Sequence, residues 1–150
     1  MATEARLSGY IYDSLLELED GAAAITADGA GSAILDLGAG HVTGDIVLDV
    51  SSIDATTGDE LYTIFAQVSD SATIASGIEH SCAIQLGGVT GALGQRDVSS
   101  LAGRFVLPFQ NQLSTRRYRY LRLYVDVSGT SPSITFKAYL SKAKSITGGN

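Results

Sequence analysis

The sequence predicts an all-β fold, namely a jelly-roll-like antiparallel β-sandwich with an extended N-terminal arm. Three observations support this prediction. Short runs rich in β-branched and aromatic residues alternate with clusters of turn-forming residues. No segment beyond residue 20 repeats its apolar residues at the helical spacing. The chain of 150 residues is 45% hydrophobic, which is enough for one buried core, and its 17 glycines suit many turns.

The chain divides into three predicted parts: an extended N-terminal arm at residues 1–20, a β-sandwich domain at 21–142 and a flexible C-terminal tail at 143–150. In the arm, apolar side chains lie among charges without the spacing of a strand or a helix, apart from one short helical turn expected at 14–19. Such an arm packs on a partner or folds back over a sheet edge. Its candidate contacts are Leu7, Tyr10, Tyr12, Leu15 and Leu16.

Eight strands are predicted within the sandwich domain, as in a jelly roll. Turns that contain glycine separate most of them. Pro108 has no N–H to give to a neighbouring strand, so its strand should lie at a sheet edge or contain a bulge. The predicted strands span 22–27, 33–37, 42–50, 61–69, 78–86, 104–109, 117–127 and 133–141.

The last two strands show the clearest alternation of apolar and polar residues. The five residues at 128–132 that connect them predict a hairpin. One face of this hairpin is apolar and should join the core, and it consists of Leu121, Leu123, Val125, Val127, Ile134, Phe136, Ala138 and Leu140. The opposite, exposed face carries the remaining candidate contacts, which are Tyr118, Tyr120, Arg122, Tyr124, Lys137 and Tyr139.

This exposed face is the best candidate for a protein interface. Tyrosine and arginine are enriched in interfaces because each combines a large contact area with a polar tip. The alternative is that cross-strand tyrosine pairs only stabilise the sheet.

Two classes of partner are not expected. Arginines interleaved with tyrosines at 116–124 could bind nucleic acid by charge and stacking. However, the net charge of −6 opposes phosphate, and the glycine of the RNA-recognition pattern is missing. A membrane partner is not expected either, because the sequence has no signal peptide and no apolar run of bilayer length.

Charge is divided sharply along the chain. Residues 1–95 carry fourteen acidic side chains and one basic one, whereas residues 96–150 carry nine basic and two acidic. If the two blocks form separate surfaces, their opposite potentials steer docking to another copy or to a charged neighbour. If folding interleaves the blocks, the charges mix in space and no such surfaces arise.

No residue pattern indicates an enzyme, a cofactor or a metal site. The chain has neither a nucleophile elbow nor a phosphate-binding loop. His80 and Cys82 share the apolar side of a predicted strand, which predicts a core histidine and a core thiol, since zinc needs three or four protein ligands. The loop carboxylates Asp54, Asp59 and Glu60 could hold calcium, but their spacing is not that of an EF-hand, and solvated turns are the alternative.

Several segments occur in an order that points to a family. They lie at 12–18, 22–27, 34–38, 104–108, 119–125 and 133–140. In this order the chain resembles the small capsid cement (decoration) proteins of tailed bacteriophages, of the kind known from a Bordetella podovirus. The resemblance spans nearly the whole chain, and its most specific part is the strand that begins Arg-Tyr-Leu-Arg at 119–122.

The resemblance implies a jelly-roll-like sandwich on the outer surface of an icosahedral phage head, where it clamps adjacent major capsid proteins and stabilises the shell. It implies a virion protein made in the cytoplasm of the bacterial host, a homodimer or alternatively a homotrimer, and no catalysis, metal or cofactor. The second interpretation is a carbohydrate- or receptor-binding β-sandwich module of a phage tail or a lectin-like protein, in which exposed aromatic rings stack on sugars.

Overall fold

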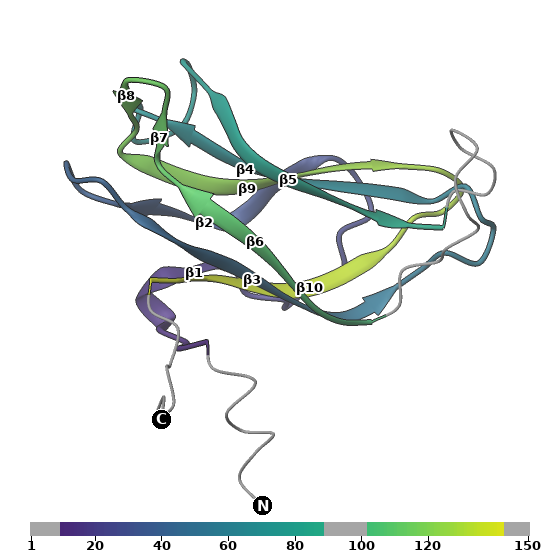
Figure 1. The fold of residues 1–150 in the computed structure, drawn as a ribbon. Coiled ribbons are helices and arrows are strands. Elements are labelled where there is room, and N and C mark those ends of the chain that lie inside the picture. The colour runs from purple at the N-terminus through teal and green to yellow at the C-terminus, as the bar shows by residue number, and fades with distance from the viewer. Residues whose placement is uncertain (1–9, 89–101, 143–150) are drawn as a thin grey trace, which may run out of the picture.

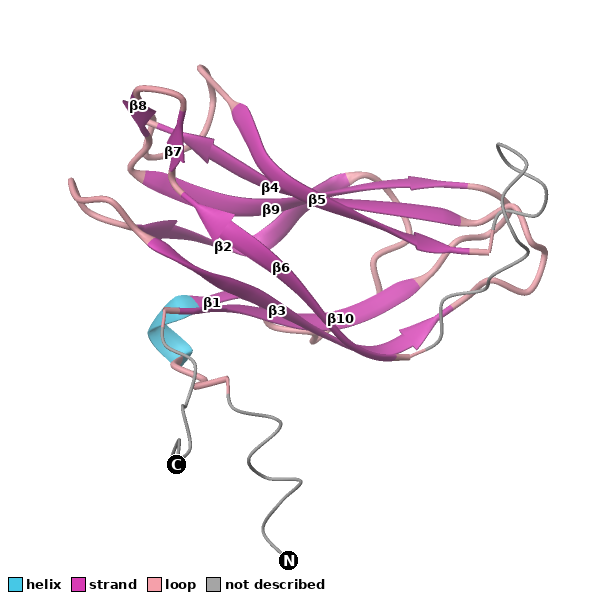
Figure 2. Ribbon diagram, viewed as in Figure 1, coloured by secondary structure: helices cyan, strands magenta, loops and turns pink. Residues whose placement is uncertain are grey.

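The computed structural model describes residues 10–88 and 102–142. Over these residues two four-stranded sheets face each other, with a two-stranded ribbon at one end (Figure 1). The regular structure is almost entirely β, and the one helix in the described part is the single 3-10 turn η1 (Figure 2). The predicted all-β sandwich is therefore confirmed. Leu7 and the tail at 143–150 lie outside the described residues.

The two main sheets are named after their central strands. The β3 sheet has the strand order β1-β10-β3-β6, and the β4 sheet has the order β2-β9-β4-β5. The ribbon is β7-β8. The bounds are η1 Ser14–Leu16, β1 Glu17–Glu19, β2 Gly29–Asp36, β3 Thr43–Ile53, β4 Leu61–Ser69, β5 Glu79–Gly87, β6 Gly103–Gln110, β7 Gln112–Leu113, β8 Arg116–Arg117, β9 Tyr120–Ser128 and β10 Ile134–Ser141.

The strand order is that of a jelly roll. The connections β1 to β2, β2 to β3 and β3 to β4 each cross from one sheet to the other, and so do β5 to β6 and β9 to β10. Within the main sheets, β4 and β5 are the one consecutive pair in the described chain that forms a hairpin. Each sheet buries one face against the other, which explains why the period-2 pattern of the sequence is strong.

The hairpin expected for the last two strands is wrong, because β9 and β10 lie in different sheets. β9 pairs with β2 and β4, whereas β10 pairs with β1 and β3. The buried Tyr62 fixes the crossing between them. Its hydroxyl accepts a hydrogen bond from the N–H of Ser133 (2.8 Å) and donates one to the carbonyl oxygen of Asp54 (2.7 Å). Alternation does not separate the two arrangements, since either one gives each strand a single apolar face.

The inward faces of β9 and β10 are as predicted. Seven of the eight residues expected on the core side are buried, and Val127 is half-buried against the core. An unexpected contribution comes from β1, whose Leu18 is fully buried in the same cluster.

Two predicted strands differ from the structure. Residues 22–27 form no strand, and Ile25 instead makes an isolated bridge in which it exchanges two backbone hydrogen bonds with Ile134 (2.7 and 3.0 Å). The strand expected at 117–127 is interrupted, because β8 ends at Arg117 and β9 begins at Tyr120. The interruption takes Tyr118 out of the alternation of β9.

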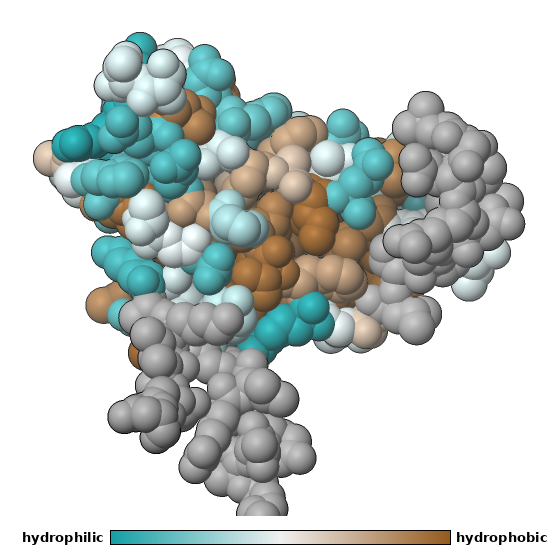
Figure 3. Space-filling model, in the orientation of Figure 1, coloured by the Kyte–Doolittle hydropathy of each residue, from teal (hydrophilic) through white to brown (hydrophobic). Residues whose placement is uncertain are grey.

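Both strands on one side of the sandwich, β5 and β6, are sheet edges. The expectation that Pro108 lies in an edge strand is confirmed, since it belongs to β6. A register shift leaves Ser81 as an extra residue in β5, which is a β-bulge. Prolines and bulges at edges hinder pairing with a foreign strand. Figure 3 shows hydrophobic surface on this side of the molecule. Ile84 of β5 and Phe105 of β6 are half-buried and pack against the core.

Candidate functional site

The structure separates the predicted contact residues onto two opposite outer faces. The separation follows from the strands, because β9 belongs to the β4 sheet and β10 to the β3 sheet. The outer side of the β3 sheet, together with the chain folded onto it, is called the arm face, and its predicted contacts are Tyr10, Tyr12, Leu15, Lys137 and Tyr139. Leu16, also expected as a contact, is half-buried and packs against the core. The outer side of the β4 sheet is called the β9 face, and its predicted contacts are Tyr120, Arg122 and Tyr124.

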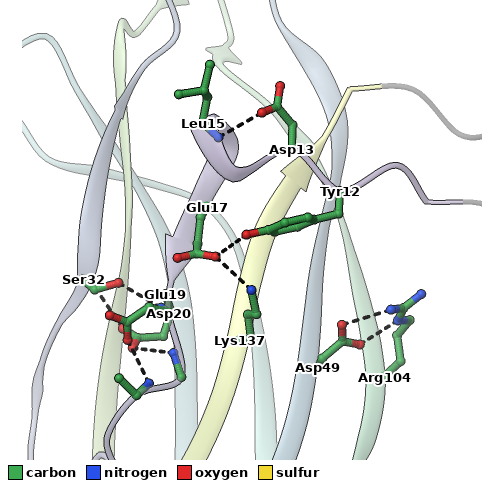
Figure 4. A network of polar contacts seen from close by, with 12 residues as sticks. Tyr12, Asp13, Leu15, Glu17, Glu19, Asp20, Ser32, Asp49, Arg104 and Lys137 are labelled. Atoms are coloured by element: carbon green, nitrogen blue, oxygen red, sulfur yellow. Dashed lines mark hydrogen bonds and ion pairs between the residues drawn. The ribbon is translucent and has the colours of Figure 1, made fainter.

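Residues 10–19 fold back onto the β3 sheet, which is one of the two outcomes expected for the arm (Figure 4). The Tyr12 hydroxyl donates a hydrogen bond to Oε2 of Glu17 (2.7 Å). Nζ of Lys137 lies 3.2 Å from the same oxygen and 4.5 Å from the centroid of the Tyr12 ring. The Tyr12 ring also meets Tyr139 edge to face, with centroids 5.1 Å apart. These four side chains are called the clasp.

The clasp changes the ionisation of its members. Hydrogen bonds from Tyr12 and Lys137 lower the pKa of Glu17 below its ordinary value of 4.5. Hydrogen bonds with Tyr12 and Glu17 raise the pKa of Lys137. Tyr139, expected to be exposed, is only 4% exposed, and this burial raises its pKa. Tyr139 therefore packs beneath the Tyr12 ring of the arm and has little exposed surface with which to contact a partner.

Three large apolar side chains of the folded-back arm are exposed to solvent. Asp13 caps η1 by accepting a hydrogen bond from the N–H of Leu15 (2.9 Å), and Leu15 is 82% exposed. Ile11 is 53% and Tyr12 45% exposed, so these three are the majority of the five large hydrophobic side chains exposed in the described chain. Ile11 N–H donates to Oγ of Ser141 (3.2 Å), which holds the group beside the end of β10. Ile11, Tyr12 and Leu15 are called the apolar tip.

Strand β1 anchors the arm face to the sandwich. Leu18 fills the core, while Oε2 of Glu19 accepts a hydrogen bond from the N–H of Ser32 (2.9 Å) and Oε1 accepts one from the N–H of Gly21 (3.3 Å). Burial raises the pKa of Glu19. Figure 4 shows the Glu19 carboxylate linking β1 to Ser32 of β2. Residues 10–19 thus belong to the same packed unit as the sandwich.

On the opposite side, the β9 face carries a row of hydrogen-bonded side chains across three strands. Nε of Arg122 donates to Oε1 of Gln67 (2.8 Å), and Nε2 of Gln67 lies 3.2 Å from Nε2 of His80. The His80 ring stacks on Phe65 with centroids 4.3 Å apart and an interplanar angle of 28°. The guanidinium carbon of Arg122 lies 5.9 Å from the centroid of the Tyr124 ring. Arg122, Gln67 and His80 are called the polar row.

The prediction of a core histidine is wrong, because His80 is exposed on the β9 face. Cys82 lies opposite Ala66 and His80 opposite Gln67, so Ser81 has no partner of its own. An extra residue reverses the alternation beyond it, which moves His80 outward. Cys82 stays half-buried against the core as expected, and burial raises the pKa of its thiol to about 11.

Tyr118 belongs to neither face. Although expected to be exposed, it is 7% exposed and lies in the core cluster. Its N–H donates to the carbonyl oxygen of Asn111, and Nδ2 of Asn111 donates to the carbonyl oxygen of Tyr118, both over 2.9 Å. The guanidinium carbon of Arg116 lies 5.2 Å from the centroid of its ring. Tyr118 thus closes the end of the sandwich.

The two charge blocks interleave in space. Each ion pair of the described chain joins a base from 96–150 to an acid from 1–95, and these pairs are Arg104–Asp49, Arg116–Asp70, Arg119–Asp36 and Lys137–Glu17. The two-point contact of Arg119 lowers the pKa of Asp36 to about 2. The division along the sequence therefore creates contacts within the molecule, and the alternative of mixed charges holds for the described residues.

The acidic loop residues stabilise their own turns. Asp54 accepts hydrogen bonds from the N–H and hydroxyl of Thr56, and Asp59 accepts them from the N–H and hydroxyl of Thr130. Glu60 accepts hydrogen bonds from two backbone N–H groups of its loop. Across residues 10–88 and 102–142, no three His, Cys, Asp or Glu side chains are grouped as a metal site requires.

Two comparisons with known proteins gave no match. No family model matches the chain, and no curated protein matches its sequence. No helix in the part of the chain that the structure describes is long and apolar enough to cross a bilayer. The two outer faces are the features of the molecule that bear on its function.

Proposed function

We propose that the protein is a capsid cement protein: a structural component of the virion that binds the outer surface of an icosahedral phage head. In this proposal it clamps adjacent major capsid proteins and stabilises the shell. The jelly-roll strand order and the resemblance of the segments at 119–125 and 133–140 to phage cement proteins support this assignment. Self-association as a homodimer or homotrimer is part of the same proposal, and catalysis is not.

The observation that carries the proposal is the apolar tip. Leu15 is 82% exposed, yet it sits on a turn capped by Asp13 and held over the sheet by Tyr12 and Glu17. An isolated exposed Leu needs no explanation, but three large exposed apolar side chains within five residues of one ordered segment favour a contact surface. Because the clasp orders this surface before any partner arrives, little conformational entropy is lost on binding.

The proposed mechanism is repeated burial of the arm face. Burying one Leu side chain is worth about 1.5–3 kcal/mol, which is modest for a single contact. On a symmetric shell each oligomer makes the contact more than once, and linked contacts add to strong attachment. A molecule that touches two neighbouring subunits resists their separation, which is how a clamp stiffens a shell.

The test substitutes Leu15→Ser in the full-length protein. Attachment to empty heads that lack the protein should weaken about tenfold or more, since the lost burial is about 1.5–3 kcal/mol. The thermal midpoint should not change, because an exposed side chain contributes little to folding. Co-sedimentation of the purified variant with heads of the parent phage measures the attachment.

Ile78→Ser is the matched control. Ile78 is also a large exposed hydrophobic residue, at 37%, but it lies before β5 and off the arm face. Its variant should attach as the unchanged protein does. An equal loss of attachment in both variants would contradict the proposal. So would failure of the unchanged protein to bind the heads.

A further inference from the structure

We propose that the β9 face binds a carboxylated sugar, such as a uronic or sialic acid unit, with Arg122 as the carboxylate-binding residue. This second function goes beyond shell attachment, and it is located on the side of the sandwich opposite the arm face. A molecule fixed to a surface through the arm face leaves the β9 face pointing away from that surface.

Arg122 differs from three of the four other arginines in the described chain, and the fourth, Arg117, lies in the β7-β8 ribbon. Arg104, Arg116 and Arg119 each form an ion pair with an aspartate. Arg122 is half-buried, and its described partner is the neutral Oε1 of Gln67, so no carboxylate of the described chain neutralises it. Its Nε is used, while the two terminal nitrogens form the fork that binds a carboxylate through two parallel hydrogen bonds.

The fork is held in a fixed position. Gln67 is only 7% exposed, and its amide is bound on one side by Arg122 and on the other by His80. The His80 ring is held in turn by stacking on Phe65. A charged group fixed by such a chain is ready to bind without further ordering.

Ring surfaces and hydrogen-bonding groups alternate beside the fork. Tyr124 follows Arg122 on the same side of β9 and lies opposite Phe65, while exposed Ile34 of β2 lies opposite Arg122 on the other side. A pyranose presents C–H groups on its faces and hydroxyls at its rim. Aromatic rings suit the former, and the imidazole and the tyrosine hydroxyl suit the latter.

A sugar fits this face better than a peptide does. Peptides that pair with a sheet need a free edge, and β9 and β4 are central strands that are paired on both sides. Peptides that dock by an anchor side chain need a pocket, whereas Arg122 and Tyr124 lie on the outer face of a central strand. An acidic peptide is the competing ligand, and the experiment must distinguish its binding from that of an acidic sugar.

The experiment is an NMR titration of the full-length protein with N-acetylneuraminic acid and with glucuronic acid. Glucose is the neutral-sugar control, and glutarate and a Glu-rich peptide are the carboxylate controls. We expect saturable shifts of the Arg122 Nε–H and Gln67 amide signals with the two acidic sugars at millimolar concentrations. Glucose should give none, and glutarate and the peptide should bind several-fold more weakly.

The matched pair of variants is Arg122→Gln and Arg117→Gln. Both arginines donate from Nε to a glutamine Oε1, but Arg117 and its partner Gln112 lie in the β7-β8 ribbon, away from the β9 face. Losing a charge-assisted contact should weaken acidic-sugar binding by about tenfold or more for Arg122→Gln only. Arg122→Lys should also bind poorly, because an ammonium cannot form the fork.

Three results would overturn the proposal. The first is no saturable shift with either acidic sugar. The second is equal binding of glutarate or the peptide, which would assign the face to acidic protein segments. The third is equal loss in the Arg122 and Arg117 variants. An unchanged thermal midpoint in Arg122→Gln confirms that the comparison is between folded proteins.

Discussion

At the scale of single residues, Ser81 decides what the β9 face can do. As the extra residue of the β5 bulge it turns His80 outward, and its hydroxyl donates a hydrogen bond to the carbonyl oxygen of Gln110 in β6 (2.7 Å), which links the two sheets. Bulges commonly re-aim one side chain in this way. Without it, His80 would continue the buried side of β5 and the polar row would end at Gln67.

The polar row also sets the tautomer of His80. Nε of Arg122 can only donate a hydrogen bond, so Gln67 accepts this bond on Oε1. The NH₂ group of Gln67 then points toward His80. Nε2 of His80 must then accept, and its proton must be on Nδ1. We predict the Nδ1–H tautomer for neutral His80, measured by nitrogen chemical shifts of the imidazole.

Arg122→Ala supplies the control for this prediction. Removing Arg122 frees the Gln67 amide to rotate, so the preference for one tautomer should weaken. A dominant Nε2–H tautomer in the unchanged protein would show that the row is not connected as described.

At the scale of elements, the arm is a strand with a capped turn attached to it. β1 pairs with β10, and Leu18 inserts into the core. Deleting residues 1–20 would therefore remove part of the fold, so point substitutions at the apolar tip test the function more cleanly than truncation does. The clasp determines whether the tip stays in place.

Acid should loosen the clasp. The folded-state pKa of Glu17 is lowered from 4.5, so its contribution is complete above about pH 4.5 and is lost as the pH falls through the lower folded value. We predict that hydrogen exchange at the N–H of Ile11 and the ring signals of Tyr12 change in this acidic range, before the sandwich unfolds. NMR at stepwise lower pH measures both.

Glu17→Gln removes the titrating group and serves as the control. Its arm signals should resemble those of the acidified protein already at neutral pH, and their pH dependence in the acidic range should disappear. If the arm signals of the unchanged protein follow global unfolding at every pH, the clasp does not act as a separate unit.

At the scale of the whole molecule, the fold class and most strands were predictable because alternation reports directly on burial. The side chains of β9 and β10 that face inward follow this rule. The sheet to which each strand belongs was not predictable in the same way. Two consecutive strands show the same alternation of apolar and polar residues whether they pair in one sheet or pack against each other from opposite sheets. The exposed side chains of the last two strands were therefore expected on one surface, whereas the structure divides them between the β9 face and the arm face.

Local exceptions explain the remaining differences. The bulge at Ser81 and the break after Arg117 each shift the alternation of inward and outward side chains. For this reason His80 was wrongly predicted to be in the core and Tyr118 wrongly predicted to be exposed. The residues Phe65 and Gln67 were missed, although the alternation of β4 puts both on the outer side. The contacts of the arm with its own sheet depend on pairs far apart in the sequence, such as Tyr12 with Lys137 and Tyr139.

A cryo-electron microscopy map of parent phage heads decorated with the full-length protein would test the capsid-cement proposal directly. We predict that the β3 sheet faces the shell, with Leu15 in contact with the major capsid protein and Arg122 pointing outward. A map in which the β4 sheet faces the shell, or heads that remain undecorated, would contradict it.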